Sequence, residues 1–240
     1  MRKAARSHLE MPSKSPAKGT RGRPPVYSRD EIVRAAKVAF SQIGYATVTL
    51  DQLATRLNTG KGTIYYHSSR KVDLLIAISR DLIGASIGEL QRIQALRAPA
   101  DVRFVMAMRA HMEKILSDQQ ASKVYFENEA DLPRPIRTEL RAVLRDIESI
   151  FIRIVSEGVQ SGVFRSDDPV MSVRHAMALC AWPYRWYSPS GRLSRADFID
   201  TAIDFALSAL KTGPSLHSVT AADGKSTRRG RNPKKTAGSS

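Results

Sequence analysis

The chain of 240 residues has a single cysteine, Cys180, and no run of 18 consecutive apolar residues. One cysteine excludes a disulfide framework within a monomer and a metal cluster built on thiolates. Without a long apolar run, no conventional membrane-spanning helix is expected. The basic N-terminus is not followed by an apolar segment, so the sequence predicts no signal peptide. Together these absences favour a reducing, cytoplasmic setting.

Catalytic signatures are missing as well. The sequence contains no P-loop, no Gly-rich dinucleotide motif and no Ser-His-Asp signature. The acidic and histidine side chains of the middle region are poorly spaced for a metal or acid–base site. His111 and Glu113 are two residues apart, as are Glu127 and Glu129, and such pairs point to different sides of a helix. We therefore expect no enzyme activity, no cofactor and no metal site.

Positive charge is abundant but concentrated at the two ends. Lys and Arg number 38 against 23 Asp and Glu, for a formal net charge of +15. Residues 1–27 and 211–240 each hold seven basic residues and one acidic residue, whereas residues 28–210 hold 24 basic and 21 acidic residues. Within this nearly balanced body, residues 28–71 hold seven basic and three acidic residues, so the excess of positive charge lies at this end. A basic end favours a polyanion such as nucleic acid as partner; tails that only keep the protein soluble are the alternative.

The stretch from Thr47 to Leu75 reads as two short helices joined by a tight turn. Thr49 and Gln52 form a capping box, so a helix should begin directly after Thr49. Residues 58–60, Asn-Thr-Gly, break this helix and include two residues that tolerate a positive φ. A second helix begins near Lys61. This is the helix-turn-helix pattern, whose second helix enters the major groove of DNA.

The rest of the body also reads as helix. Ser28 and Glu31 form another capping box, and an apolar face of helical period follows as far as Gly44. No convincing β-period alternation is present. The fold class expected is all-α, with a three-helix DNA-binding unit and a larger helical domain. Further helices are predicted over residues 71–96, 100–117, 121–130, 133–159, 168–182 and 194–211.

Residues 28–75 resemble the DNA-binding domain of the tetracycline-repressor (TetR) family of bacterial regulators. The residues that carry the resemblance are Gly44-Tyr45, Thr49, the segment LATRL, the run from Lys61 to His67, Lys71 and Leu74-Leu75. The resemblance implies a DNA-binding domain over residues 28–75 and a helical ligand-binding and dimerisation domain over 76–211. Residues 1–27 and 212–240 are then a disordered basic arm and a disordered basic tail.

The chain departs from the family pattern at two places. The family usually has Gly-Val-Ser where this chain has Asn58-Thr59-Gly60, and Phe where this chain has Ser68. Asn58 still tolerates the left-handed turn. We expect Thr59 and Ser68 to loosen the small core, and Gly60 to weaken the cap of the second helix, which is the recognition helix.

The resemblance also implies which side chains contact DNA. Lys61 and Thr63 lie on the first turn of the recognition helix, where side chains reach base edges. Tyr66, His67 and Lys71 are assigned to phosphates, which position the domain without reading sequence. Alternatives are core packing for Tyr65, a hydrogen bond within the turn for His67, and an ordinary exposed lysine at position 71. The full candidate set here is Thr49, Lys61, Gly62, Thr63, Tyr65, Tyr66, His67 and Lys71.

A second nucleic-acid signal lies in the N-terminal arm. The segment Arg21-Gly22-Arg23-Pro24 resembles the core of an AT-hook, which lies in the narrow minor groove of A/T-rich DNA. Arginine prefers that groove because its potential is most negative there, so Arg21 and Arg23 are candidate DNA contacts. The C-terminal segment 228–235 echoes the motif. The alternative is a tail whose charge is incidental.

The second domain is expected to bind a small molecule and to dimerise. In the TetR family the last two helices form a dimeric four-helix bundle, here residues 168–182 and 194–211. Alanines at 176, 181, 202, 206 and 209 are small enough for close helix approach. Several segments resemble a branch that senses coenzyme A thioesters, namely 126–129, 132–133, 157–158, 161–164 and 185–189.

An acyl-CoA pocket needs apolar walls and a cationic rim. Arg185 is the candidate for a phosphate, and ordinary core packing is the alternative for the rest. The candidate wall residues are Met108, Met112, Phe126, Trp182 and Trp186, together with Met106, Tyr125 and Tyr187. The sequence thus predicts a homodimeric repressor that binds palindromic operator DNA and is released by a small molecule, with acyl-CoA as first candidate. The alternative is an architectural protein that binds A/T-rich DNA without ligand control.

Overall fold

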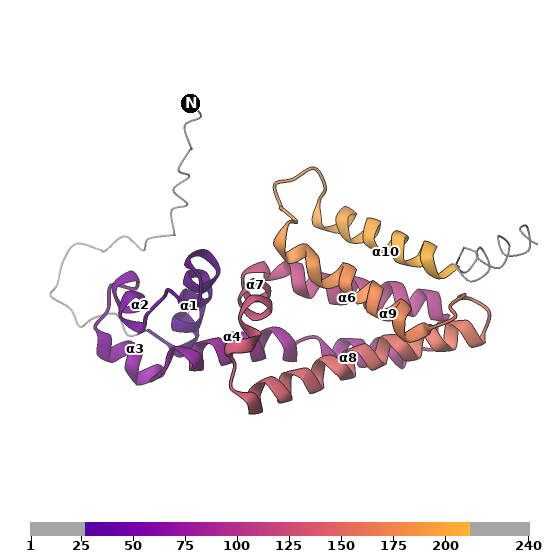
Figure 1. The fold of residues 1–240 in the computed structure, drawn as a ribbon. Coiled ribbons are helices and arrows are strands. Elements are labelled where there is room, and N and C mark those ends of the chain that lie inside the picture. Colours follow the sequence, from indigo (N-terminus) through magenta and orange to yellow (C-terminus); the bar gives the residue numbers. More distant parts are fainter. Residues whose placement is uncertain (1–26, 212–240) are drawn as a thin grey trace, which may run out of the picture.

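The computed structural model describes residues 27–211. The predictions for the arm, including Arg21 and Arg23, and for the tail beyond residue 211 lie outside the described residues. Within them the all-α expectation is confirmed, since the structure has ten α-helices, two short 3-10 helices and no strand (Figure 1).

The elements are α1 Arg29–Ile43, α2 Leu50–Arg56, α3 Lys61–His67, α4 Lys71–Gly84, α5 Ile87–Gln94, α6 Ala100–Ser117, α7 Gln119–Asn128, η1 Glu129–Asp131, α8 Arg134–Gln160, α9 Pro169–Ala181, η2 Trp182–Arg185 and α10 Arg195–Lys211.

Most predicted helices are confirmed to within a few residues, with one exception. The single helix expected over residues 71–96 is wrong, because α4 ends at Gly84 and α5 begins at Ile87. Gly84 and Gly88 flank this break, and glycine has the highest backbone entropy to lose in a helix. The described helices include none with the length and apolarity that crossing a membrane requires.

The helix-turn-helix forms as its local signals indicate. The Thr49 hydroxyl accepts from the Gln52 amide at 3.2 Å, and the Gln52 side chain accepts from the Thr49 amide at 2.9 Å. In the turn, Asn58 has a φ of 50°, whereas Gly60 is extended at −69°. Of the two residues that tolerate a positive φ, Asn58 therefore supplies the left-handed conformation of the turn and Gly60 does not. Gly60 is instead the N-cap of α3 and offers no side-chain cap, which confirms the weaker cap.

Two hydrophobic cores hold the protein together. The first joins α1 to α4 with α7 and the start of α8, so that Ile64 of the recognition helix and Tyr125 of α7 belong to one cluster. The second joins α5, α6, α8, α9 and α10, around the edge-to-face rings of Phe104 with Phe151 and Phe164. Gly158 lets Phe164 approach α8, because a Cβ at that position would lie 2.2 Å from its ring.

Candidate DNA-binding surface and effector cavity

One face of the recognition helix α3 is open to solvent. Ile64 is fully buried and anchors the helix to the head, which is the unit formed by α1 to α3 and the first half of α4. On the opposite side Tyr66 is 87% exposed and Tyr65 is 49% exposed, so Tyr65 is not a core residue. Lys61 and Gly62 are also exposed. The structure therefore brings the base-reading candidates and the tyrosines onto an accessible surface that a major groove can accept.

Several of the predicted contact residues already have partners in the protein. The Lys61 ammonium pairs with Asp51 at 2.5 Å, and this hydrogen bond raises the pKa of Lys61. The hydroxyls of Thr59 and Thr63 are 3.1 Å apart, and the His67 ring meets Tyr66 edge-on at 5.0 Å. The Lys61–Asp51 pair is exposed and can exchange for a DNA contact at small cost, whereas Thr63 and His67 are half-buried.

Lys71 has a structural role that the sequence did not reveal. Its ammonium donates to the carbonyls of Tyr45, at 2.7 Å, and Ala46, at 3.1 Å. It also lies 4.4 Å from the centre of the Tyr45 ring. The cation thus fixes the loop between α1 and α2, where we expected a side chain free to clamp a phosphate.

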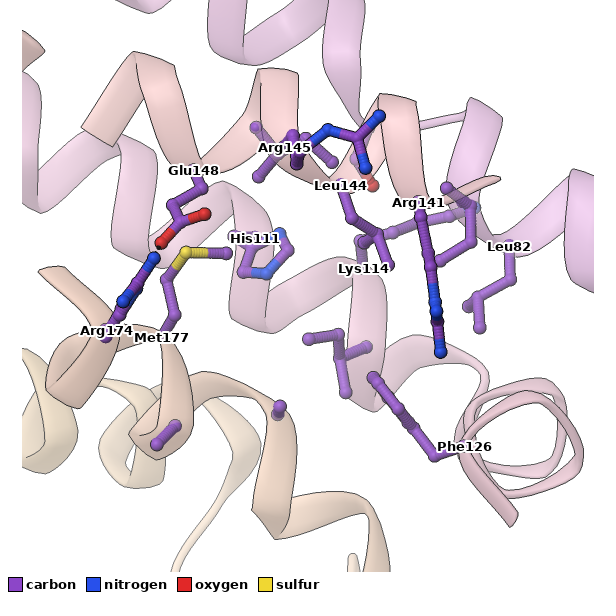
Figure 2. A pocket seen from close by; sticks show the side chains of 16 residues that line it. Leu82, His111, Lys114, Phe126, Arg141, Leu144, Arg145, Glu148, Arg174 and Met177 are labelled. Carbon is purple, nitrogen blue, oxygen red and sulfur yellow. Dashed lines mark hydrogen bonds and ion pairs between the residues drawn. The ribbon is translucent and has the colours of Figure 1, made fainter. Parts of the chain in front are cut away.

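The body, which comprises the helices from the second half of α4 onwards, contains a cavity of about 500 Å³ between α4, α6, α7, α8 and α9 (Figure 2). Its walls are mainly apolar, a property typical of small-molecule sites of this size. Figure 2 shows His111 near its middle, with the Glu148–Arg174 ion pair on one side and Phe126 and Arg141 on the other. The apolar lining includes Leu82, Ile83, Ile115, Leu144, Ile147 and Met177.

Four cationic side chains line the same cavity. Arg141 pairs with Glu129 at 2.6 Å and Arg174 pairs with Glu148 at 2.8 Å. Within residues 27–211, no carboxylate pairs with the side chains of Lys114 or Arg145. Lys114 is half-buried. An unpaired cation beside an apolar cavity favours an anionic ligand, because the ligand supplies the missing counter-charge.

One polar atom in the cavity lacks a partner. His111 is 8% exposed, and its Nδ1 has no hydrogen-bond partner within the described residues. Burial lowers the pKa of this imidazole to about 4, so the ring is neutral near pH 7. Among the same residues, no group of three His, Cys, Asp or Glu side chains is arranged to hold a metal ion.

Polar contacts join the head to the body. Lys37 of α1 pairs with Asp118, which also caps α7 by accepting from the Ala121 amide at 3.0 Å. Helix α4 contributes to both parts. Its residues Leu74 and Leu75 lie in the head core, and further along the same helix Leu82 lines the cavity.

Comparison with known proteins accounts for both parts of the chain. Residues 32–78 match the family model described as bacterial regulatory proteins of the tetR family. Residues 97–210 match the model described as the tetracyclin repressor-like C-terminal domain.

The chain belongs to the TetR family. Its relatives include the transcriptional repressor KstR2 of Mycolicibacterium smegmatis, which is 27% identical over 175 residues that cover 71% of this chain and 84% of the relative. The structure of ketosteroid regulator KstR2 of Mycobacterium tuberculosis has a TM-score of 0.72 at 18% identity, over 80% of this chain and all of that one. The structure of AibR in complex with isovaleryl coenzyme A and operator DNA has a TM-score of 0.66 at 21% identity, over 74% of this chain and 96% of that one. These two structures show the TetR fold.

The structure places the predicted ligand residues in four different environments, namely the cavity, the core, an outer depression and the exposed surface. Phe126 lines the cavity, as expected. Met108 and Met112 do not, because they are fully buried in the core on a neighbouring face of α6. Trp182 and Arg185 border an outer depression beside Phe126. Trp186 is 59% exposed and packs edge-on against Phe198. Met106 is also exposed, whereas Tyr125 and Tyr187 are buried.

Sequence reasoning missed His111 as a cavity residue and all four cavity cations. A signal for part of this set was present in α8, where Arg141, Arg145 and Glu148 follow helical spacing beside the apolar residues Leu144 and Ile147. Charged side chains beside an apolar stripe of a helix are typical of the rim of a cavity, but also of the solvent-exposed face of an ordinary amphipathic helix. The sequence does not distinguish the two.

Proposed function

We propose that this TetR-family protein is a homodimeric transcriptional repressor whose affinity for operator DNA is lowered by an acyl-CoA. The observation that carries the proposal is the position of α4. Both halves of the helix belong to the core that includes Ile64 of the recognition helix, and Leu82 and Ile83 in its second half also form a wall of the cavity. A ligand that displaces this wall biases the orientation of the head, which is the two-state element that allosteric release needs.

The chemistry of the cavity supports an acyl-CoA. Apolar walls favour an acyl chain, and the unpaired cations Lys114 and Arg145 favour phosphates or another anion. Phe126 and Ala181 belong both to the cavity and to the outer depression. There the Arg185 guanidinium lies 5.2 Å from the Trp182 ring. The depression also contains Tyr184 and the Glu127 carboxylate, and its aromatic rings suit the adenine of coenzyme A. AibR, which has the same fold, is described as bound to isovaleryl coenzyme A.

The face shared by α9 and α10 supports a homodimer. Phe205 is 67% exposed beside a small groove of about 90 Å³ that includes Ala176, Leu179 and Ala206. A two-fold axis would place Phe205 of each protomer against the groove of the other, which is the self-complementary arrangement of an isologous interface. Ala181, which we expected on this face, lines the effector cavity instead.

The dimer would place two recognition helices in successive major grooves of a palindrome. We further propose that Arg21 and Arg23 reach the adjacent minor groove. The support is Tyr27, whose phenol donates to the Leu57 carbonyl at 2.6 Å. This bond places the start of the described chain beside the turn that precedes α3.

The proposal is tested by selecting an operator from a randomised DNA library and titrating the complex with acyl-CoA thioesters and the matching free acids. We expect an inverted-repeat operator and release by a thioester. Linkage requires that operator lowers thioester affinity by the same factor by which thioester lowers operator affinity. Binding to A/T-rich DNA that no small molecule alters would instead support an architectural protein.

A further inference from the structure

One acidic residue lies within the helix-turn-helix. Residues 49–67 include a single carboxylate, that of Asp51. Its Oδ2 accepts a hydrogen bond from the Lys61 ammonium over 2.5 Å, so the first turn of α2 is joined to the first residue of the recognition helix α3. A carboxylate beside DNA is repelled by the phosphates. Its place next to a base-reading candidate therefore needs a physical reason.

The Asp51 carboxylate depends on Lys61 for its counter-charge. Its Oδ1 is enclosed by protein atoms and has no hydrogen-bond partner within residues 27–211, so the bond from Lys61 to Oδ2 is the one that compensates its charge. The pair contributes little to folding, since the side chains of Lys61 and Asp51 are 68% and 46% exposed. An acid in the first turn also favours the dipole of α2. That benefit requires no contact with Lys61, so it does not explain the pair.

DNA offers the Lys61 ammonium two kinds of partner. Base edges differ from one sequence to another, whereas phosphates are the same in all of them. The ammonium has three donor hydrogens, so it can bind a base edge while one hydrogen stays on Asp51. Where no base accepts, phosphates remain as partners. When the ammonium moves to a phosphate, the Asp51 carboxylate loses its counter-charge beside a polyanion, and this cost falls on non-specific binding.

We infer that Asp51 determines specificity in DNA binding, because it holds the Lys61 ammonium for a base edge and lowers affinity for DNA that offers Lys61 no matching base. This inference rests on the proposed binding of operator by α3 and adds a positioning residue to it. An acid that acted only through long-range repulsion would weaken binding to every sequence alike. Asp51 should instead weaken binding to non-specific DNA more than binding to the operator, which is discrimination by a repulsive element.

The test compares two duplexes bound by the full-length protein, namely the operator selected by the wild type and a scrambled duplex of equal length and composition. Fluorescence anisotropy at several salt concentrations gives both affinities. Asp51→Asn keeps the shape of the side chain and removes its charge. We expect this variant to bind the scrambled duplex several-fold more tightly, with a log–log salt slope steeper by roughly 0.9, because Lys61 is free to neutralise one more phosphate. Operator affinity should change little, so the preference for operator falls. Asp51→Glu keeps the charge and should retain most of the preference.

Asp30→Asn is the matched control, because Asp30 is likewise an exposed acid in the first turn of a head helix, α1. It should leave the preference for operator unchanged. In a Lys61→Met background, Asp51→Asn should no longer lower the preference, since the residue that Asp51 positions is gone. If Asp51→Asn tightens binding to both duplexes equally, or if its effect on the preference persists without Lys61, the inference is wrong while operator binding stands. If the wild type selects no operator, both fail.

Discussion

The ammonium of Lys123, on α7, donates a hydrogen bond to the backbone carbonyl of Ser41, on α1, over 2.8 Å. Together with the Lys37–Asp118 ion pair it joins the outer face of the head to the helix that also carries Phe126 into the cavity. These interactions provide a second connection between head and body beside α4. They therefore offer a way to weaken communication without touching either ligand.

The first prediction is that the double variant Lys37→Met, Lys123→Met uncouples effector from operator. Lys123 is exposed and Lys37 is half-buried. Contacts of lysines this close to solvent contribute little stability, about 0–1 kcal/mol each. The head should stay folded but move more independently of α7. The affinity for effector in the absence of DNA should be unchanged. The coupling factor, by which bound operator lowers effector affinity, is typically roughly 5–150 and should fall several-fold in the variant. Calorimetry with and without operator measures this factor.

The control is Lys211→Met, which removes a lysine ion pair with Asp101 inside the body. It should keep the wild-type coupling factor. An unchanged factor in the double variant would mean that α4 and the apolar core shared by α1 and α7 carry the signal without these polar contacts.

The second prediction concerns the recognition helix. Lys61→Ala and Tyr66→Ala should each weaken operator binding without unfolding the protein, because both side chains are exposed. Lys61→Ala should also relax preference at one base pair, by ~1–3 kcal/mol if the ammonium reads a guanine. Electrophoretic or fluorescence titrations on operator and single-base variants measure both effects. Arg97→Ala, which removes an exposed charge between α5 and α6, should leave binding intact.

The head could be predicted from the sequence because its signals are local. Ser28 with Glu31 and Thr49 with Gln52 are three residues apart, and both capping boxes form as expected. Asn58 supplies the positive φ of the turn. Hydrogen bonds over three residues require no knowledge of the remaining fold. The structural role of Lys71 could not be predicted in this way, because its carbonyl partners lie 25 and 26 residues away.

The cavity could not be predicted in the same way. Met108 and His111 are three residues apart on α6, yet one is core and the other lines the cavity. Their separation depends on how α6 is rotated against α8 and α9, which no local pattern encodes. Core and cavity wall have the same apolar composition. The unpaired Nδ1 of His111 is the exception, and it is visible only when its surroundings are known.

The third prediction concerns the N-terminal arm, whose residues 1–26 lie outside the described structure. Deleting residues 2–25 should lower operator affinity and flatten its salt dependence, by roughly 0.9 in the log–log slope for each phosphate that the arm neutralises in the full-length protein. Replacing Arg21 and Arg23 with Ala should matter more on A/T-rich flanks, where the minor groove is narrow. The same slope and affinity in the truncated protein would leave the arm as a solubilising tail.

The fourth prediction concerns the dimer. Phe205→Glu should place two charges in the apolar grooves of the α9–α10 face. Each Phe side chain buried there contributes about 1.5–3 kcal/mol to dimerisation, and the two-fold axis doubles the effect. The dissociation constant of the dimer should therefore rise by a factor of about 100 or more. Sedimentation velocity measures the dissociation constant. Leu96→Glu changes another exposed apolar residue outside that face and should remain dimeric. A Phe205→Glu dimer of normal strength would place the interface elsewhere.

The fifth prediction concerns the pH dependence of stability. Burial lowers the pKa of His111 to about 4 in the folded protein, whereas an unfolded histidine titrates near ~6.5. The unfolded chain therefore takes up this proton first as the pH falls. The contribution of neutral His111 to the free energy of unfolding is present above roughly pH 6.5 and is lost progressively towards pH 4. This loss amounts to about 2 kcal/mol between pH 7 and pH 4.5. His111→Phe lacks this loss. Urea unfolding of both proteins at the two pH values isolates it, because the Asp and Glu titrations are common to both. A pH dependence as steep in His111→Phe as in the wild type would show that His111 is protonated, or accessible to water, in the folded protein.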